Sequence, residues 1–167
     1  KRQVSGWAWS ENIGWISFNC TNTGCPTLNY GVNIDPSTGN FSGYAWSDNI
    51  GWIDFAPAGP FPAAPSYSAR VDLATKEVSG WARALAYGAG WDGWIKLRGT
   101  NYGVWIDDSV SPAEFRGFAW SDMVVGWISF NCSNQDVCET SNYKVVIGLV
   151  VNQLPSAADL SRTPADY

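Results

Sequence analysis

The sequence predicts an all-β protein in which four copies of a three-stranded antiparallel unit close into a ring. Three short motifs recur four times in a fixed order along the 167 residues. Each motif has the length, the alternation and the aromatic or β-branched content of a strand, and no stretch shows a helical period. In addition, the first copy lacks one strand, and the last motif of the chain supplies a spare one. The repeat and its phase together favour a closed arrangement.

The central strand of each unit is predicted from a motif in which glycine is followed by an aromatic residue and alanine. Its glycines lie 37 residues apart, at Gly6, Gly43, Gly80 and Gly117. Along the second copy, Phe41 and Ala45 share one face of the strand with Gly43, and Tyr44 and Trp46 project from the other face. One face is largely small and the other bulky, which suits sheets that stack with large side chains against small ones.

Two flanking strands complete each unit. A Gly-Trp-Ile motif after the central strand predicts the third strand, and its tryptophans are Trp15, Trp52, Trp94 and Trp127. A motif that begins with Tyr predicts the first strand, at 30–34, 67–71, 102–106 and 143–147. Asp, Asn, Gly and Pro between the motifs supply the turns of hairpin connections. A residue that recurs in every unit is one that the unit needs, so we interpret the repeated glycines and tryptophans as structural.

The phase of the repeat predicts how the ring closes. The first unit begins directly with its central strand, whereas the motif at 143–147 has no unit of its own. Pairing these two strands completes a closed domain over 1–147, with units at 1–29 plus the closing strand 143–147, at 30–66, at 67–101 and at 102–142. Such an offset is typical of closed rings, which protect the edges of their sheets. We expect a small four-bladed, propeller-like ring, and the alternative is a closed antiparallel barrel of about twelve strands.

The C-terminal residues 148–167 do not continue the repeat. They have no period, and Pro155 and Pro164 interrupt them, so we expect a linker or a docked tail. Together with a first residue, Lys1, that is not Met, this segment indicates a module of a larger protein.

Four cysteines occupy equivalent loops, after the third strand of the first unit and of the fourth. Each pair is close enough in sequence for a local bridge, so we predict the disulfides Cys20–Cys25 and Cys132–Cys138, although four cysteines allow three connectivities. A zinc site made of all four is the alternative, which the spacing and the absence of His disfavour. Disulfides form in oxidising compartments, so we expect an extracellular or cell-surface protein.

Composition excludes several classes of function. The 10 Lys and Arg residues are scattered among 15 Asp and Glu, for a net charge of −5, so the chain lacks the basic cluster that binds nucleic acids. No apolar run approaches the ~20 residues of a membrane-spanning helix. The chain has no His, which removes Ser-His and Cys-His nucleophile pairs and most zinc sites. We expect no nucleic-acid partner, no membrane insertion and no cofactor.

The repeat is similar to one known family of sequences. The segment 42–55, Ser-Gly-Tyr-Ala-Trp-Ser-Asp-Asn-Ile-Gly-Trp-Ile-Asp-Phe, and the segments 14–20 and 126–132, both Gly-Trp-Ile-Ser-Phe-Asn-Cys, resemble a repeat of large predicted secreted proteins from uncultured, small-genome bacteria. The resemblance covers about residues 4–147. It implies export and a modular architecture, and it carries no established activity. The third unit departs from the pattern over 83–93, where the connection is five residues longer than in the second unit.

Departures from the repeat are the candidates for ligand binding. In the third unit Arg83 replaces the Trp of the other units, and the longer loop adds Tyr87, Trp91 and Asp92. In the fourth unit Trp105 takes a position that is Asn, Arg or Val elsewhere. Aromatic rings stack on the apolar face of a sugar, and Asp and Arg bind its hydroxyls, so these five residues form the predicted glycan site. The alternative is that the insertion shields an edge or fills the gap left by the missing Trp.

Turn carboxylates support further alternatives. The acidic residues in the hairpin turns of each unit are expected to accept backbone N–H bonds. They are Glu11, Asp48 and Asp122 in the turns after the central strands, and Asp35, Asp72 and Asp107 in the turns after the first strands. Calcium binding by these turns is the alternative, although no Asp-x-Asp-x-Asp-Gly loop is present. The candidate catalytic residues of a hydrolase with paired carboxylates are Asp54, Asp92, Asp107 and Asp108. Their spacing in the sequence does not place any two of them across a cleft.

The sequence therefore predicts a non-enzymatic structural or binding module of a larger secreted or cell-surface protein. The sharper form of this hypothesis is carbohydrate or surface adhesion of a lectin-like kind, with a glycan or another cell-surface ligand as partner. A glycoside-directed enzyme and a self-assembling structural subunit are the alternatives.

Overall fold

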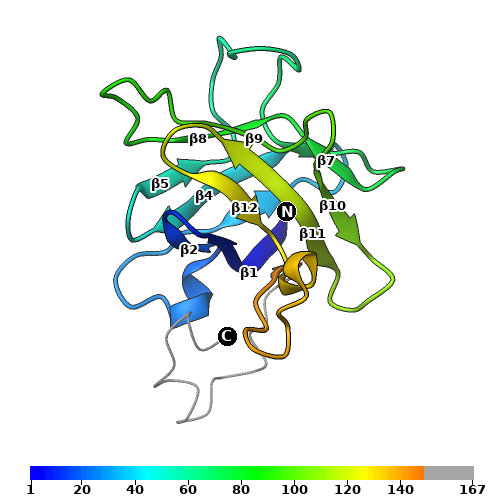
Figure 1. Cartoon of the computed structure of the whole chain (residues 1–167). Coiled ribbons are helices and arrows are strands. Elements are labelled where there is room, and N and C mark those ends of the chain that lie inside the picture. Colours follow the sequence, from blue (N-terminus) through cyan, green and yellow to red (C-terminus); the bar gives the residue numbers. More distant parts are fainter. Residues whose placement is uncertain (149–167) are drawn as a thin grey trace.

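The computed structural model describes residues 1–148, which form an all-β, antiparallel domain of 13 strands (Figure 1). The central strands are β1 (Arg2–Ser10), β4 (Phe41–Ser47), β7 (Glu77–Ser79) with β8 (Trp81–Ala84), and β11 (Glu114–Ser121). The third strands are β2 (Gly14–Ser17), β5 (Gly51–Asp54), β9 (Trp94–Lys96) and β12 (Gly126–Ser129). The first strands are β3 (Val32–Ile34), β6 (Arg70–Val71), β10 (Val104–Asp107) and β13 (Val145–Ile147). Two 3-10 helices, η1 (Cys20–Thr23) and η2 (Cys132–Gln135), follow β2 and β12.

Each central strand takes part in two rings of strands. Its C-terminal half pairs with its own third strand and with that of the preceding unit, in the order β1-β2-β4-β5-β8-β9-β11-β12. This third-strand ring of eight strands closes where Trp9 of β1 pairs with Ser129 of β12. The N-terminal half pairs with its own first strand and with that of the following unit, which gives the first-strand ring β1-β3-β4-β6-β7-β10-β11-β13. In that ring β4 and β6 are joined by the bridge between Asn40 and Arg70.

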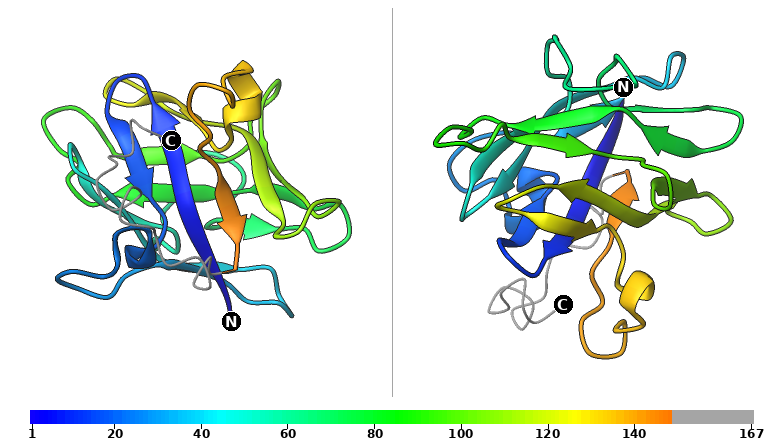
Figure 2. Two further views of the ribbon diagram at one scale, coloured as in Figure 1. Left: turned by 90° about the horizontal axis from the view of Figure 1, so that it is seen from below. Right: turned by 45° about the horizontal axis from the view of Figure 1, so that its top comes forward.

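The pairing expected between the two ends of the domain is present. β13 lies antiparallel beside the start of β1, with Val4 opposite Ile147 and Gly6 opposite Val145 (Figure 2). A four-bladed propeller is not confirmed, because the units of a propeller form separate sheets whereas these units are hydrogen-bonded to both neighbours. A twelve-stranded meander is not formed either. The third strands pair with the next central strand instead of the next first strand, so the ring contains eight strands.

The repeated glycines lie where each central strand passes from one ring to the other. At Gly6, Gly43, Gly80 and Gly117 the backbone φ is between +85° and +88°, a conformation that glycine adopts without strain. A Cβ atom at Gly43 would lie 2.0 Å from the carbonyl oxygen of Gly31. Each of the four glycine carbonyls accepts the N–H of the residue that follows the third strand, which is Phe18, Phe55, Leu97 or Phe130. The glycine of the repeat is therefore required by a close approach of two backbones.

The interior is filled from alternate positions of the strands. Phe41 and Ala45 of β4 are buried and Tyr44 is exposed, which agrees with the predicted alternation. The bulky face lies on the outside of the ring and not against a second sheet, so the expected stacking of large against small sheet faces is absent from the described residues. Phe18 and Phe130, from neighbouring units, are both buried and their ring centroids are 5.4 Å apart.

Both predicted disulfides are formed, Cys20–Cys25 and Cys132–Cys138. No free cysteine remains in the part of the chain that the structure describes, so the zinc alternative is wrong. Two disulfides are compatible with an extracellular protein.

Each disulfide loop presents an asparagine to a repeated glycine. The Asn134 side-chain oxygen accepts the N–H of Gly117 at 2.9 Å, and its amide nitrogen donates to the Gly117 carbonyl at 2.7 Å. Asn22 makes the same two bonds to Gly6 at 2.9 and 2.7 Å. The loops therefore satisfy backbone groups at the point where the central strand changes ring.

Of the linker or tail predicted at 148–167, only Gly148 belongs to the described residues, and its N–H donates to the carbonyl of Gln3. The remainder of that prediction lies outside the described residues. In residues 1–148, no helix is long and apolar enough to cross a membrane.

Candidate functional site

Aromatic side chains cover the outer face of the third-strand ring. In three units the Trp of the third strand packs on the Trp of the central strand, since the inward positions of both strands carry Ala and Ile. The ring centroids are 4.6 Å apart for Trp9 and Trp15, 4.7 Å for Trp46 and Trp52, and 4.7 Å for Trp120 and Trp127. A first-strand tyrosine packs edge-on against the same rings, as Tyr102 does against Trp127 at 5.0 Å. These clusters form the walls of two outer grooves.

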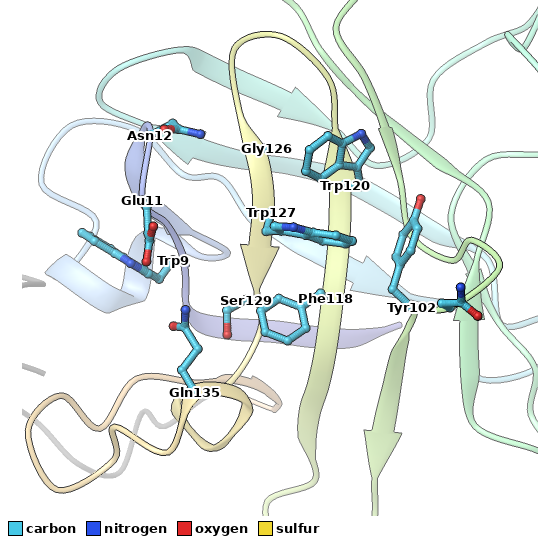
Figure 3. Close-up of a pocket in the computed structure, with 11 residues that line it drawn as sticks. Trp9, Glu11, Asn12, Tyr102, Phe118, Trp120, Gly126, Trp127, Ser129 and Gln135 are labelled. Atoms are coloured by element: carbon cyan, nitrogen blue, oxygen red, sulfur yellow. The ribbon is translucent and has the colours of Figure 1, made fainter.

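One groove lies between the fourth and first units and has a volume of about 640 Å³ (Figure 3). We call it the 4/1 groove. Trp127 is 49% exposed, and Figure 3 shows it standing across the groove from Trp9 and Glu11. The rest of the wall comes from β11, β12, η2, the turn after β1 and the loop before β10. Its residues are Trp120, Phe118, Asn101, Tyr102, Asn12, Gly126, Ser129 and Gln135.

A second groove, the 1/2 groove, lies between the first and second units and has a volume of about 580 Å³. Trp15 and Trp46 line it together with Asp48. The indole N–H of Trp46 donates to Asp48 Oδ1 at 2.8 Å, which fixes the orientation of that ring. The other lining residues are Trp7, Ile13, Gly14, Ser17, Thr23, Pro26, Thr27, Leu28, Tyr30, Asn49 and Trp52.

The two grooves are made from equivalent positions of the repeat. Trp127 in the 4/1 groove corresponds to Trp15 in the 1/2 groove. The same correspondence relates Phe118 to Trp7, Gly126 to Gly14, Ser129 to Ser17, Trp9 to Trp46, Glu11 to Asp48 and Asn12 to Asn49. The repeat thus places the same seven positions in the walls of both grooves.

Serine hydroxyls hold the turns that separate the central and third strands. The Ser10 hydroxyl accepts the N–H groups of Asn12 and Ile13, and the Ser47 hydroxyl accepts the equivalent pair in the second unit. Ser10 is buried, and its own proton is donated to the carbonyl of Val125 at 2.9 Å. The backbone N–H groups of these turns therefore need no carboxylate.

The carboxylates of the two grooves are free of that role, so the expectation that they accept backbone N–H bonds is wrong. Glu11 accepts no hydrogen bond from the residues of 1–148, and Asp48 accepts only the indole N–H of Trp46. Neither groove is lined by a Lys or Arg. Each groove therefore presents one uncompensated negative charge beside aromatic rings.

The carboxylates that follow the first strands behave as expected. The Ser37 hydroxyl and N–H, donating to Asp35, lower the pKa of that carboxyl below its ordinary value. The N–H groups of the Asp72 turn and the Ser109 hydroxyl lower the pKa values of Asp72 and Asp107 in the same way. Asx turns explain these three residues, and they line neither groove.

Tyrosine hydroxyls give the grooves proton donors. Burial raises the pKa of Tyr30 above its ordinary value, and its hydroxyl donates to Ser17 Oγ at 2.9 Å. Burial also raises the pKa of Tyr102. Both hydroxyls therefore stay protonated at neutral pH. Tyr30 donates its one proton to Ser17, whereas the Tyr102 hydroxyl donates to no residue of 1–148 and keeps its proton for another acceptor.

The structure brings together three of the five residues predicted to bind a glycan. The Arg83 guanidinium stacks 3.6 Å from the Tyr87 ring centroid, and its Nε donates to the Asp92 carbonyl at 2.9 Å. Trp91 is only 6% exposed and belongs to the hydrophobic core. Trp105 is 42% exposed, but it lies in β10 of the first-strand ring, whereas the insertion belongs to the third-strand ring.

The third unit covers the tryptophan of its third strand, which is half-buried or exposed in the other units. Trp94 is 7% exposed, because Arg83 lies 4.4 Å over its ring and Phe61 packs on it at 5.6 Å between centroids. Arg83 therefore covers Trp94 from the position of the missing Trp, and Tyr87 of the insertion stacks on Arg83.

Sequence reasoning missed both grooves because it assigned the repeated tryptophans to packing alone. A signal was present in the alternation, which turns Trp9 and Trp46 outward, and in the acidic residue two positions after each of them. An outward aromatic ring beside a carboxylate, repeated at equivalent positions, is the pattern that marks the grooves.

Carboxylates are not paired in either groove. Glu11 is the acidic residue that lines the 4/1 groove, and Asp48 is the one that lines the 1/2 groove. Asp54 and Asp92, two of the candidate catalytic residues, accept the N–H groups of nearby residues in their own loops. Within residues 1–148 no group of three or more His, Cys, Asp or Glu side chains is placed to hold a metal ion.

Comparison of the chain with models of protein families, with curated proteins and with solved structures finds no match. The inference of function therefore rests on the geometry of the two grooves.

Proposed function

We propose that the protein is a non-enzymatic carbohydrate-binding module of a larger extracellular or cell-surface protein, with the 4/1 and 1/2 grooves as its two binding sites. The observation that carries this proposal is that the repeat builds the same aromatic groove twice. Each copy combines tryptophan rings, a carboxylate and amide side chains in a hollow of several hundred cubic ångströms.

The chemistry of the grooves suits sugar rings. A pyranose presents C–H groups on its faces and hydroxyls at its edge, so it needs an aromatic surface flanked by planar polar groups. In the 4/1 groove Trp127 offers the surface, and Glu11, Asn12 and Gln135 offer acceptors and donors. The exposure of Trp127 is costly in water, and a bound sugar would remove that apolar area from solvent.

Binding without catalysis is favoured by the number of carboxylates. Glycoside hydrolysis commonly uses two carboxyl groups ~5–10 Å apart on either side of the scissile bond. Each groove is lined by one acidic residue, Glu11 or Asp48. One carboxylate can orient hydroxyls, and it cannot supply both acid and base.

The test is a glycan array followed by calorimetric titration of the sugar with the highest signal. We expect two sites per molecule. Trp127→Ala should remove the 4/1 site and Trp46→Ala the 1/2 site, each lowering the stoichiometry to one or weakening that site about tenfold, since loss of an aromatic partner removes about 1.5 kcal/mol. Trp105→Ala is the matched control, because it removes an exposed tryptophan that lines neither groove.

Equal binding by wild type and both groove variants would refute the assignment of the sites. A loss of binding in Trp105→Ala alone would return the site to the residues predicted from the sequence. Light scattering on the same samples tests the self-assembly alternative, since Trp127→Ala would then change the molar mass of the particle instead of its affinity for sugar.

A further inference from the structure

We infer that the two grooves select glycans by charge: they bind amino sugars, whose protonated amine pairs with Glu11 or Asp48, and they reject glycans that carry uronate or sialate groups. This inference rests on the proposed function and names the class of sugar that it requires.

Both grooves keep a carboxylate that the turns do not need. Ser10 and Ser47 satisfy the turn N–H groups, so Glu11 and Asp48 are not needed for the turns that carry them. The two acidic residues nevertheless occupy equivalent positions, and each lines its groove. Glu11 accepts no hydrogen bond from residues 1–148, and Asp48 accepts one at a single oxygen, so both carboxylates keep oxygen atoms that a cation can contact.

The acceptor atoms of both carboxylates lie beside indole rings. In the 1/2 groove Asp48 Oδ1 accepts the indole N–H of Trp46, which holds the carboxylate beside the ring and leaves Oδ2 without a partner among the described residues. In the 4/1 groove Figure 3 shows the Glu11 carboxylate beside the ring of Trp9. An ammonium group placed there would contact a carboxylate oxygen beside an indole ring, and the charge-assisted hydrogen bond favours a cation.

The charge around both grooves favours a cationic ligand over an anionic one. No Lys or Arg lines either groove, and the chain carries a net charge of −5. A uronate or sialate would therefore meet a like charge at short range and no compensating cation, which is unfavourable. A neutral N-acetylated sugar would retain the stacking contact and lose the ion pair.

The experiment titrates the whole chain with a glucosamine oligomer, with the same oligomer after full N-acetylation, and with a uronate oligomer of equal length. All three titrations are run at one pH of about 6, which lies below the pKa of a free amine. We expect the glucosamine oligomer to bind at least about tenfold more tightly than its N-acetylated form, which is the lower end of what one hydrogen bond to a charged group gives. Raising the salt concentration should reduce that ratio, and the uronate oligomer should not bind.

Charge-removing variants assign the effect to the grooves. The double variant Glu11→Gln, Asp48→Asn should bind both glucosamine forms equally, because the amide side chains keep the shape and the hydrogen-bond acceptor for Trp46. Asp108→Asn is the control: it makes the same kind of change at an exposed carboxylate that lines neither groove, and the preference should persist.

The outcomes separate this inference from the function on which it rests. If the N-acetylated or uronate oligomer binds as tightly as the glucosamine oligomer, the selection by charge is wrong and the carbohydrate module stands. If no glycan binds in these titrations or on the array, the proposed function fails as well.

Discussion

Substituting Gly43 by alanine tests whether the repeat is governed by the crossing of the two rings. Gly43 has a φ of +85°, and an added Cβ would lie 2.0 Å from the carbonyl oxygen of Gly31. That oxygen accepts the N–H of Tyr44 at 3.1 Å, so relief of the clash requires β3 and β4 to separate and the bond to lengthen. The φ of an alanine here costs about 1–2 kcal/mol, and losing this backbone bond costs about 1–3 kcal/mol more.

Gly24→Ala is the control for the backbone term alone. Gly24 has a φ of +80°, yet nothing lies within 4 Å of an added Cβ. Urea titration followed by tryptophan fluorescence should therefore give a loss in the free energy of unfolding of about 1–2 kcal/mol for Gly24→Ala and about 2–5 kcal/mol for Gly43→Ala. Equal losses for the two variants would show that the close approach of the strands does not select glycine.

Two further predictions concern the core and the response to acid. Trp91→Ala should lower the free energy of unfolding by about 3–5 kcal/mol, because a buried indole is removed. Tyr87→Ala in the same loop should lower it by at most about 1 kcal/mol. Urea titration of both variants checks this, and similar losses would place Trp91 on the surface. Hydrogen bonds lower the folded pKa values of Asp35, Asp72 and Asp107 below the ordinary value of 3.8, so their stabilisation is complete above that value and is lost as the pH falls through the folded pKa. Thermal melts between about pH 6 and pH 2 should show a fall that begins near pH 4 and is smaller in Asp72→Asn; an identical acid profile for that variant would contradict the assignment.

The strands and the pairing of the two ends could be predicted because both are recorded in the repeat. The motif lengths and alternation identified the three strands of each unit, and the missing first strand of the first unit required the pairing of 143–147 with β1. The equivalent loops likewise identified both disulfides. Each of these features depends on residues close in sequence or on a count of strands.

The connectivity of the rings could not be predicted from the same pattern. A repeat in which a first, a central and a third strand follow one another is compatible with three arrangements. These are separate blades, one continuous meander, and two rings that share their central strands. The choice depends on whether a third strand pairs with the next central or the next first strand, and Gly43 carries the signal. A glycine at φ +85° inside an otherwise regular strand indicates that the strand changes partners midway, which periodicity alone does not express.

The candidate site was harder to predict because one residue type has two roles. Trp94 and Trp127 occupy the same position of the repeat, but Trp94 is 7% exposed and Trp127 is 49% exposed. Their surroundings differ through residues far away in sequence, since Phe61 covers Trp94 whereas the surface of Trp127 faces Trp9 at the other end of the chain. No local pattern distinguishes the two tryptophans.

This difference suggests how one repeat can vary its function without changing its fold. Inward positions such as Ala45 and Ile53 are fully buried, so a change there alters the packing of both rings. Outward positions such as Arg83 and Trp120 contact only the surface cluster of their own or a neighbouring unit, so a groove can be opened or filled by one side chain and one loop. The third unit, which carries Arg83 in place of the outward Trp, is also the unit whose third-strand Trp94 is covered. The 4/1 and 1/2 grooves both adjoin the first unit, which the closing strand completes. Closure of the ring therefore does more than protect an edge: by placing β12 beside β1, it brings together Trp127 and Glu11, which no hairpin within a single unit could do.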